Sequence, residues 1–357
     1  MTVLITGATG FIGRHLCAHL TGEGATVMAM LRQPARQLPE LRRAVDRLGG
    51  DGQLVVGIPG DLDAPELGLP MGLPDVEAII HLGARFGWRL DPAVAQRTNV
   101  AGSLAVAKLA RSLGCRLVFI SGFMLENRAH LEKLGITSDD PEQVNWSQVY
   151  RRAGSYEASK LEAAIRVRAF AQHTGIDLVE VQPATVAGHS ESGELDRAQP
   201  LYTLLDNLAR GRMALVPGTP EHWLPLVPVD HLARLIALAA MAGEVPGRLL
   251  ALDATTPNLR GLLTTAAHEL GKRPPTRHIP MPILAALLSI PGVARIMNTP
   301  VETLHFIQPT RFETADQERF ATEQGLRRSD ITEVIRRTAS FYAGLGGRTV
   351  SEPGNVS

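Results

Sequence analysis

The chain opens with a short apolar run, a turn with evenly spaced glycines and a helical pattern, and this combination constrains the fold most. Residues 3–5 are expected to form a buried strand, and Gly7, Gly10 and Gly13 follow at intervals of three. A helical pattern then continues over residues 15–20. A glycine turn between a first strand and a first helix is typical of βαβ units, whose parallel strands are covered by helices on both faces.

Similar apolar runs recur along the first half of the chain, with helical patterns between most of them. The expected strands cover residues 26–31, 54–56, 78–80, 117–120 and 178–181, and the expected helices include residues 100–113 and 156–173. This alternation predicts an α/β fold of the Rossmann type, with a doubly wound parallel sheet.

The glycine turn also indicates a ligand. Gly7 allows the tight turn, Gly10 lets a pyrophosphate approach the backbone, and Gly13 lets the helix pack closely on the strand. The phosphates would bind the N–H groups at the positive end of the helix. The motif therefore predicts dinucleotide binding.

The end of the second expected strand bears on which dinucleotide is bound. Asp or Glu at this point would bind the ribose hydroxyls of NAD, whereas this chain has Leu-Arg-Gln-Pro-Ala-Arg over residues 31–36. The guanidinium groups of Arg32 and Arg36 are suited to a 2′-phosphate. The sequence favours NADP, and the alternative is two solvated surface arginines.

Tyr156 and Lys160 are four residues apart on an expected helix, so both project from one face. An ammonium beside a phenol, together with a nicotinamide charge, is expected to lower the phenol pKa from about 10. Tyr156 would then protonate a carbonyl oxygen while hydride arrives from the cofactor.

The pattern changes after Gly188, and the remainder is richer in loops and prolines. Expected helices cover residues 201–210 and 229–241, and a last strand covers residues 249–252. We expect a dinucleotide-binding domain over residues 1–188, completed by about 226–256. Residues 189–225 and 257–345 would form a smaller, mostly helical substrate lobe, and residues 346–357 a tail.

Composition excludes several classes of protein. With 357 residues, 36 basic and 36 acidic, the chain has zero formal net charge, which disfavours a general nucleic-acid binder. The two cysteines form neither a disulfide framework nor a zinc spacing, and the eleven histidines show no metal spacing, so we expect no metal. The sequence shows neither a signal peptide nor an 18-residue apolar run, so we expect a cytoplasmic protein without a membrane span.

Taken together, these motifs resemble the extended short-chain dehydrogenase/reductase superfamily, which includes the NAD-dependent epimerases and dehydratases. Asp61, His81–Ala84, Asn99–Gly102 and the Tyr156/Lys160 pair follow in the order of that superfamily. Finer features resemble its thioester-reductase and fatty-acyl-reductase branch, and they lie in residues 60–69, 85–88, 182–190 and 226–230.

The resemblance implies a role for each matching residue. Asp61 and Leu62 would contact the adenine, Lys160 the nicotinamide ribose, and Pro183 and Val186 the nicotinamide. With the glycine turn and the two arginines, the implied cofactor contacts are Gly7, Thr9, Gly10, Phe11, Ile12, Gly13, Arg32, Arg36, Asp61, Leu62, Leu82, Gly83, Ala84, Asn99, Lys160, Pro183 and Val186.

One departure from the superfamily concerns the group that polarises the substrate carbonyl. The superfamily usually carries two adjacent hydroxyl residues after the fifth strand, and the second is catalytic. Here Gly122 occupies that position, and Ser121 lies one residue earlier. Either Ser121 reaches the carbonyl, or it is structural and a water, an amide or Ser155 donates the hydrogen bond.

We therefore expect an NADP-dependent oxidoreductase that transfers hydride to a carbonyl, with Tyr156, Lys160 and Ser121 as catalytic residues. The first-choice substrate is an acyl thioester on coenzyme A or an acyl carrier protein, or the derived aldehyde. The alternatives are a ketone or aldehyde reductase, a sugar-nucleotide epimerase or dehydratase, and a non-catalytic NADP-binding sensor. Gln182, where many members carry Arg, speaks against the sugar-nucleotide class. Superfamily members are often homodimers.

Two other segments allow alternatives. Residues 281–291 form the most apolar stretch of the second half, and we expect core or the wall of an acyl pocket before a membrane contact. Residues 126–142 form a charged insertion, which is either a lid on the substrate side or a solvated loop.

Overall fold

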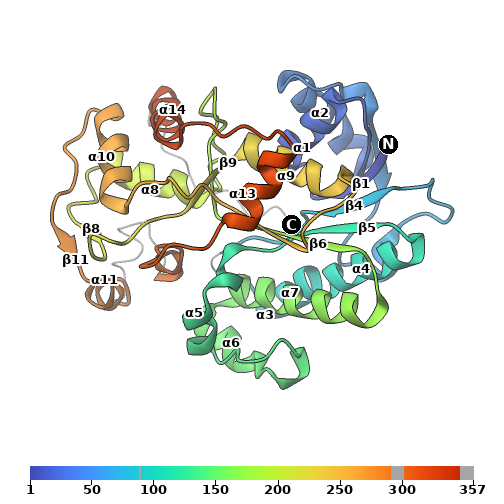
Figure 1. Ribbon diagram of the computed structural model, residues 1–357, viewed down its shortest axis with the longest axis horizontal. Helices are drawn as coiled ribbons and strands as arrows, with labels where there is room; N and C mark the ends of the chain where they lie inside the picture. The colour runs from blue at the N-terminus through green and yellow to red at the C-terminus, as the bar shows by residue number, and fades with distance from the viewer. Residues whose placement is uncertain (88–89, 291–300, 346–357) are drawn as a thin grey trace. The chain divides into compact units, whose positions relative to one another are not determined.

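A sheet of seven parallel strands forms the centre of the first of two units into which the chain divides (Figure 1). The computed structural model describes residues 1–87, 90–290 and 301–345, and the strand count refers to these residues. The strands, in spatial order, are β10 (Arg248–Ala251), β6 (Leu178–Pro183), β5 (Arg116–Ile120), β4 (Ala78–His81), β1 (Thr2–Thr6), β2 (Thr26–Leu31) and β3 (Val55–Pro59).

Helices cover both faces of this sheet. In Figure 1, α1, α2 and α9 lie on one face, and α3, α4 and α7 lie on the other. The bounds of the first-unit helices are α1 (Phe11–Gly22), α2 (Pro34–Arg47), α3 (Pro92–Ala95), α4 (Gly102–Leu113), α5 (Arg128–Leu134), α6 (Trp146–Ala153), α7 (Ser155–Thr174), α9 (Val229–Met241) and α13 (Ala315–Glu323). A π-helical turn, η3 (Gln96–Ala101), joins α3 to α4.

The expected strands form because their apolar runs are buried on both faces, as a parallel sheet requires. In β2, every residue from Val27 to Leu31 is buried. On the α4 and α7 face, the core contains Leu4, Ile79, Leu117, Phe119, Val106, Leu161 and Ile165. Burying each of these larger side chains contributes roughly 1.5–3 kcal/mol. The predicted Rossmann-type sheet is confirmed.

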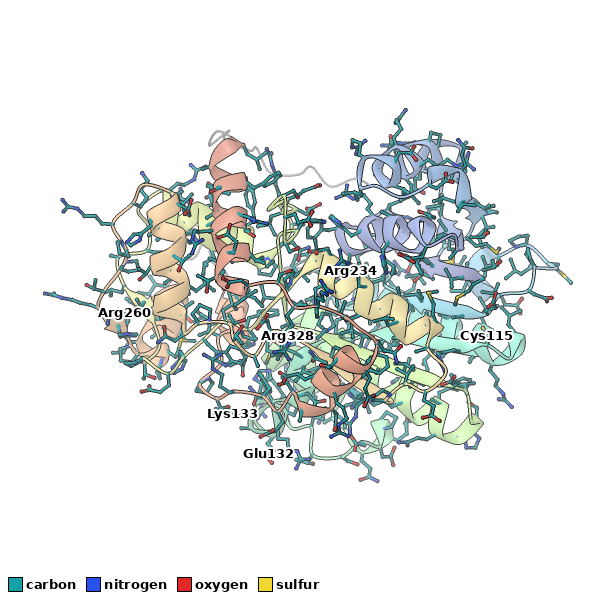
Figure 2. All side chains as sticks on the ribbon, turned by 45° about the horizontal axis from the view of Figure 1, so that its top comes forward. Cys115, Glu132, Lys133, Arg234, Arg260 and Arg328 are labelled. Atoms are coloured by element: carbon teal, nitrogen blue, oxygen red, sulfur yellow. The ribbon has the colours of Figure 1, made fainter. Side chains whose placement is uncertain are left out.

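Helices α1 and α9 lie on the same side of the sheet (Figure 1). Arg234 lies on α9 (Figure 2), and its charge acts on His19 of α1. Burial first, and then the charge of Arg234, lower the pKa of His19.

The order of the strands reverses between β1 and β4. Ligands of doubly wound sheets bind beyond the carboxyl ends of the strands at such a switch point. The two strands are in register from Val3 opposite Ala78 to Thr6 opposite His81. The residues that follow Thr6 and His81 therefore border the expected site.

Within residues 185–229, 253–290, 301–311 and 328–345, the second unit is built from helices and two short parallel strand pairs. Its helices are α8 (Pro200–Ala209), α10 (Leu259–Glu269), α11 (Met281–Leu288) and α14 (Ile331–Gly344), with a 3₁₀ segment, η6 (Val301–Phe306). The strand pairs are β7 (Thr185–Ala187) with β9 (Leu226–Pro228), and β8 (Val216–Pro217) with β11 (His278–Ile279). Helices α8, α10 and α14 pack on one another, and the Tyr342 hydroxyl donates to Asp206 at 2.8 Å.

The boundaries of the two units differ from the expected ones. The first unit contains Met1–Ala184, Asp230–Leu252 and Phe312–Arg327. The last of these ranges was expected in the smaller lobe, but α13 packs on β10, and Gln317 Nε2 donates to the Leu252 carbonyl at 3.2 Å. The second unit contains Thr185–Val229, Asp253–Arg311 and the chain from Arg328 onward. Trp88, Pro291 and the expected tail, 346–357, lie outside the described residues.

The structure excludes one expected alternative for each of two segments, the charged insertion of residues 126–142 and the apolar stretch of residues 281–291. In the charged insertion, Leu134 and Ile136 belong to the hydrophobic core, so this segment is not a solvated loop. In the apolar stretch, Ile283, Leu287 and Ile290 are 44–54% exposed, so its expected place in the core is wrong for these side chains. None of the helices that the structure describes is long and apolar enough to cross a membrane.

Candidate functional site

The glycine turn after β1 has the close contacts expected of a phosphate-binding turn. Gly7 adopts a positive φ of 76°, and a Cβ there would lie 2.8 Å from the Gly83 nitrogen. A Cβ on Gly13 would lie 2.3 Å from the Gly7 oxygen. Both positions therefore require glycine, because any side chain would displace backbone.

Helix α1 begins immediately after this turn. Gly10 caps it without a side chain, and the first turn contains no acidic residue. The N–H groups of Phe11, Ile12 and Gly13 have no intrahelical acceptor, as in the first turn of any helix. Thr9 and Gly10 are exposed, so this end of α1 is accessible. The arrangement suits an anionic pyrophosphate.

The two predicted phosphate-binding arginines are close together along the chain beyond β2. Arg32 follows the last residue of β2, and Arg36 lies in the first turn of α2. Both are exposed, and neither pairs with a carboxylate in residues 1–87, 90–290 or 301–345. Both guanidinium groups are therefore available to an anion.

Leu62 lies against the loop that follows β4. A Cβ on Gly83 would meet Leu62 Cδ1 at 2.9 Å, so these two predicted contact residues are neighbours. Asp61, one residue earlier, is held by its backbone N–H, which donates to the Leu67 carbonyl at 2.8 Å. Leu82 and Gly83 are partly buried and Ala84 is exposed.

A chain of buried hydrogen bonds fixes the end of β4. The Gly83 N–H donates to Thr6 Oγ1 at 3.1 Å, and Thr6 Oγ1 lies 2.6 Å from His81 Nδ1. His81 Nε2 lies 2.9 Å from Ser103 Oγ, which donates to the Asn99 carbonyl. The directions are consistent if His81 is neutral with its proton on Nε2. Burial first, and then the charge of Lys160, lower the pKa of His81 to about 3.

Asn99 fixes the loop after β4 to α7. Its side-chain oxygen accepts the Arg85 N–H at 2.7 Å, and its amide donates to the Arg85 carbonyl at 3.1 Å and to Ser159 Oγ at 2.9 Å. Asn99 is only 1% exposed. Its hydrogen bonds make it a positioning residue, and its direct contact with the cofactor stays a prediction.

Tyr156 lies in the first turn of α7. Its ring forms a T-shaped contact with Phe86, with 4.7 Å between the ring centroids. Burial first, and then the charge of Glu157, raise the pKa of Tyr156 to about 12. The protein's own groups do not produce the lowering of this pKa that the sequence predicts for Lys160 together with a nicotinamide, because desolvation disfavours the phenolate.

Lys160 lies one turn further along α7 and is attached to the end of β5. Its ammonium donates to the Ile120 carbonyl at 2.7 Å and lies 5.6 Å from the centre of the Phe119 ring. Burial lowers the pKa of Lys160 to about 8, and the charge of Glu180 opposes this effect.

The structure also bears on the two alternatives for Ser121. Its hydroxyl donates to Oε1 of Glu180 and is buried, so it is not directed toward a substrate. Gly122 has an extended backbone, with a φ of −178°, and a Cβ there would have no described atom within 4 Å. The structural alternative for Ser121 is therefore favoured over the expected catalytic role.

The remaining predicted residues do not all lie in one unit. Pro183 ends β6 in the first unit, whereas Val186 lies on β7 in the second unit and is buried there. The sequence did not identify Thr6, Ser103, Arg168 or Glu180. Glu180 did carry a signal, since it is an acidic residue inside an apolar strand run.

Comparisons with known proteins show which family the chain belongs to. The model of a family described as "Male sterility protein" matches residues 5–236. The large subunit of L-2-aminoadipate reductase from Penicillium chrysogenum is 28% identical over 284 residues, which are 72% of this chain and 20% of that protein. A putative dihydroflavonol 4-reductase from Synechocystis is 24% identical over 352 residues, which are 96% of this chain and 94% of that protein.

Among solved structures, the terminal R domain from the myxalamid PKS-NRPS biosynthetic pathway has the same fold. Its TM-score is 0.75 at 19% identity, with 98% of this chain and 92% of that chain covered. The chain spans only 4–20% of the length of the first four curated relatives that it matches.

Proposed function

We propose that this chain, which belongs to the male sterility protein family within the extended short-chain dehydrogenases/reductases, is an NADP-dependent reductase that delivers hydride to a substrate carbonyl. One observation carries the proposal. Tyr156 and Lys160 lie in the first turns of α7, and Lys160 is hydrogen-bonded to the end of β5, at the carboxyl edge of the sheet. Ligands of this fold bind at that edge.

The chain's residues would hold the cofactor in the following way. The first turn of α1 would bind the pyrophosphate, and Asp61 and Leu62 would contact the adenine. Leu82–Ala84 and Pro183 would line the nicotinamide side, and Lys160 would bind the ribose. The bound nicotinamide would supply the hydride.

Tyr156 would act as the general acid. A phenol with a raised pKa keeps its proton at neutral pH, so it is available to a carbonyl oxygen as negative charge develops there. The Lys160 ammonium would stabilise the phenolate that remains after transfer. The T-shaped contact with Phe86 would hold the phenol ring in place.

The choice of NADP rests on Arg32 and Arg36. Planar guanidinium groups bind phosphate oxygens through paired hydrogen bonds. Both arginines are exposed and without carboxylate partners among the described residues, so a 2′-phosphate would not have to displace an existing ion pair.

The proposed substrate is an acyl thioester on coenzyme A or on the phosphopantetheine of a carrier protein, or the derived aldehyde. Family membership supports this class, and so does the relative named as an aminoadipate reductase. The thioester carbonyl would accept hydride, and the thiol would leave to give an aldehyde. A second hydride would give the alcohol.

A ketone or aldehyde reductase is the second candidate. It is favoured by the putative dihydroflavonol 4-reductase, since that relative matches along nearly its whole length. The same Tyr156 and Lys160 would perform this reaction, with one hydride consumed per carbonyl. Stoichiometry separates the candidates, because complete reduction of a thioester to an alcohol consumes two.

The test is NADPH oxidation by the purified protein with a panel of acyl-CoA thioesters, aldehydes and ketones, with NADH in parallel. Tyr156→Phe is the control, because it keeps the ring and removes the proton. Thioester turnover that depends on NADPH and is lost in Tyr156→Phe is the expected result. Tight NADPH binding without turnover of any carbonyl would overturn the proposal in favour of a sensor.

A further inference from the structure

Glu180 is a buried carboxylate with several polar partners on the α7 side of the sheet. It lies on β6 and is 1% exposed. Oε1 accepts the Ser121 hydroxyl, and Gln182 Nε2 lies 3.5 Å from the same oxygen. Oε2 accepts Arg168 Nε at 2.6 Å. A carboxylate at this depth is tolerated only when such partners hold it.

These partners connect β6 to the helix that carries Tyr156 and Lys160. Arg168 lies on α7, two turns after Lys160, and Ser121 directly follows the Ile120 carbonyl that accepts the Lys160 ammonium. Phe119 and Glu180 are opposite each other in the β5–β6 register, and the Lys160 ammonium lies over the Phe119 ring. Glu180 therefore shares its side of the sheet with Lys160.

The charged and titratable groups around Lys160 come from three elements. Glu180 acts on it from β6, and His81 of β4 is kept neutral partly by the Lys160 charge. On α7 itself, Tyr156 lies one turn before Lys160, and Arg168 interacts with Glu180, Glu126 and Asp139. Of these groups, Glu180 is the one whose charge favours the ammonium form of Lys160.

We propose that Glu180 is a positioning residue for the reaction, since its buried carboxylate keeps the Lys160 ammonium charged and attached to the end of β5. The effect of Glu180 on the reaction rests on the proposed reductase function. Arg168 and Ser121 hold the carboxylate in place from α7 and β5. Ser121 is thereby part of this support, and its hydroxyl is not available to the substrate.

A purely mechanical role makes a different prediction. If the Glu180–Arg168 pair only fastens α7 to β6, then neutralising Glu180 weakens the fold and leaves the titration of Lys160 unchanged. If Glu180 balances the charge of Lys160, neutralising it makes deprotonation of the ammonium easier. The titration of Lys160 therefore separates the two roles without any activity measurement.

The chain is well suited to this measurement because it contains four lysines, Lys108, Lys133, Lys160 and Lys272. Protein labelled with ¹³C-lysine gives few side-chain resonances, and Lys160→Arg assigns the one from Lys160. We expect the pKa of this resonance to fall by about one to three units in Glu180→Gln. Asp177→Asn neutralises a carboxylate that pairs with Arg116 at 2.7 Å and has no contact with Glu180, so it should retain the wild-type value.

An unchanged Lys160 titration in folded Glu180→Gln would overturn the proposal. If Glu180→Gln does not fold, the double variant Glu180→Gln/Arg168→Met removes both charges and leaves neither unpaired. A lowered Lys160 pKa in that variant supports the proposal, and a wild-type value refutes it.

The catalytic consequence is read from the pH dependence of kcat/KM. In Glu180→Gln, the alkaline limit of carbonyl reduction should shift to lower pH by the same amount as the Lys160 titration. If the wild-type protein reduces no carbonyl, the proposed function fails, while the Lys160 titration still decides the role of Glu180. A titration that shifts without the alkaline limit would overturn the catalytic role.

Discussion

The Ser121 hydroxyl donates a hydrogen bond to the buried carboxylate of Glu180 on the neighbouring strand. Because of this bond, the Ser121 hydroxyl, which follows β5, points toward a buried carboxylate. The next residue, Gly122, has no side chain and no described atom within 4 Å of the position of a Cβ. Gly122 stands where the superfamily pattern predicts the carbonyl-polarising hydroxyl, and the structure has room for a side chain there.

We predict that Gly122→Ser raises the rate of carbonyl reduction. Its extended backbone accepts any residue, and a hydroxyl there would stabilise negative charge on the carbonyl oxygen. The expected gain in kcat/KM is roughly tenfold to a hundredfold, since a well-placed donor of this kind is worth about that much or more. The measurement is NADPH oxidation with the best substrate of the panel.

Gly122→Ala is the matched control for this substitution, because it adds the Cβ without the hydroxyl. It should leave the rate near that of the wild type. An equal gain from alanine and serine, or no gain from serine, would show that a hydroxyl at this position does not assist the reaction.

The cofactor preference should depend on the two arginines beyond β2. Replacing both Arg32 and Arg36 by alanine should raise the KM for NADPH by roughly tenfold to a hundredfold, because charged hydrogen bonds to the 2′-phosphate are lost. The KM for NADH should change little. Steady-state kinetics with both cofactors measures the effect.

Arg43→Ala provides the control for general charge effects, since Arg43 is an exposed arginine of the same helix, α2. That variant should keep the wild-type preference. A parallel loss of NADPH and NADH binding in the double variant would argue against selection through the 2′-phosphate.

Asn99→Ala should release the loop after β4 from α7. The substitution leaves the Arg85 N–H, the Arg85 carbonyl and the Ser159 hydroxyl without their buried amide partner. The expected cost is about 1–3 kcal/mol of unfolding free energy for each buried group left unsatisfied. Urea unfolding measures this cost, and NADPH titration should show weaker binding because Leu82–Ala84 would no longer be held.

A variant with full stability but weakened NADPH binding would instead indicate direct contact between Asn99 and the cofactor. Ser159→Ala is a useful comparison, because it removes one of these hydrogen bonds and retains the Asn99 amide. Its loss of stability should be smaller than that of Asn99→Ala.

The fold could be predicted from the sequence because the information was local. The apolar residues 27–31 are buried as a strand of a doubly wound sheet must be, and the positive φ of Gly7 follows from its place in the turn. Residues 100 and 101 were expected to belong to the helix of residues 100–113, but they fall in the π-helical turn before α4. The change from π-helical to α-helical hydrogen bonding cannot be seen in the spacing of the apolar residues.

The interior of the site could not be predicted because it depends on pairings across strands. Glu180 meets Ser121 only through the register of β5 and β6, and these two residues are 59 positions apart in the chain. His81 likewise needs Thr6 from β1 and Ser103 from α4 to become a neutral link in a buried chain. The sequence therefore indicated that a polar residue, Ser121, follows the fifth strand, but it did not indicate the direction of the Ser121 hydroxyl.

His81 should make the protein sensitive to acid. Its pKa is lowered from 6.5 to about 3 in the folded state, so the unfolded chain binds a proton in this window that the folded chain rejects. The stability linked to His81 is fully present above pH 6.5 and is lost as the pH falls toward 3. Within the window the free energy of unfolding should fall by about 1.4 kcal/mol per pH unit on account of this one group.

The measurement is urea unfolding at several pH values for the wild type, His81→Asn and His173→Asn. His81→Asn should be less stable at neutral pH, because it interrupts the links to Thr6 and Ser103, but its stability should fall less steeply with acid. His173→Asn replaces an exposed histidine of α7 and should keep the steep wild-type profile. If the unfolding free energy of the wild type and of His81→Asn depended equally on pH, the prediction would be wrong. Folding would then leave the proton affinity of His81 unchanged, although Nδ1 must stay unprotonated to accept the Thr6 hydroxyl.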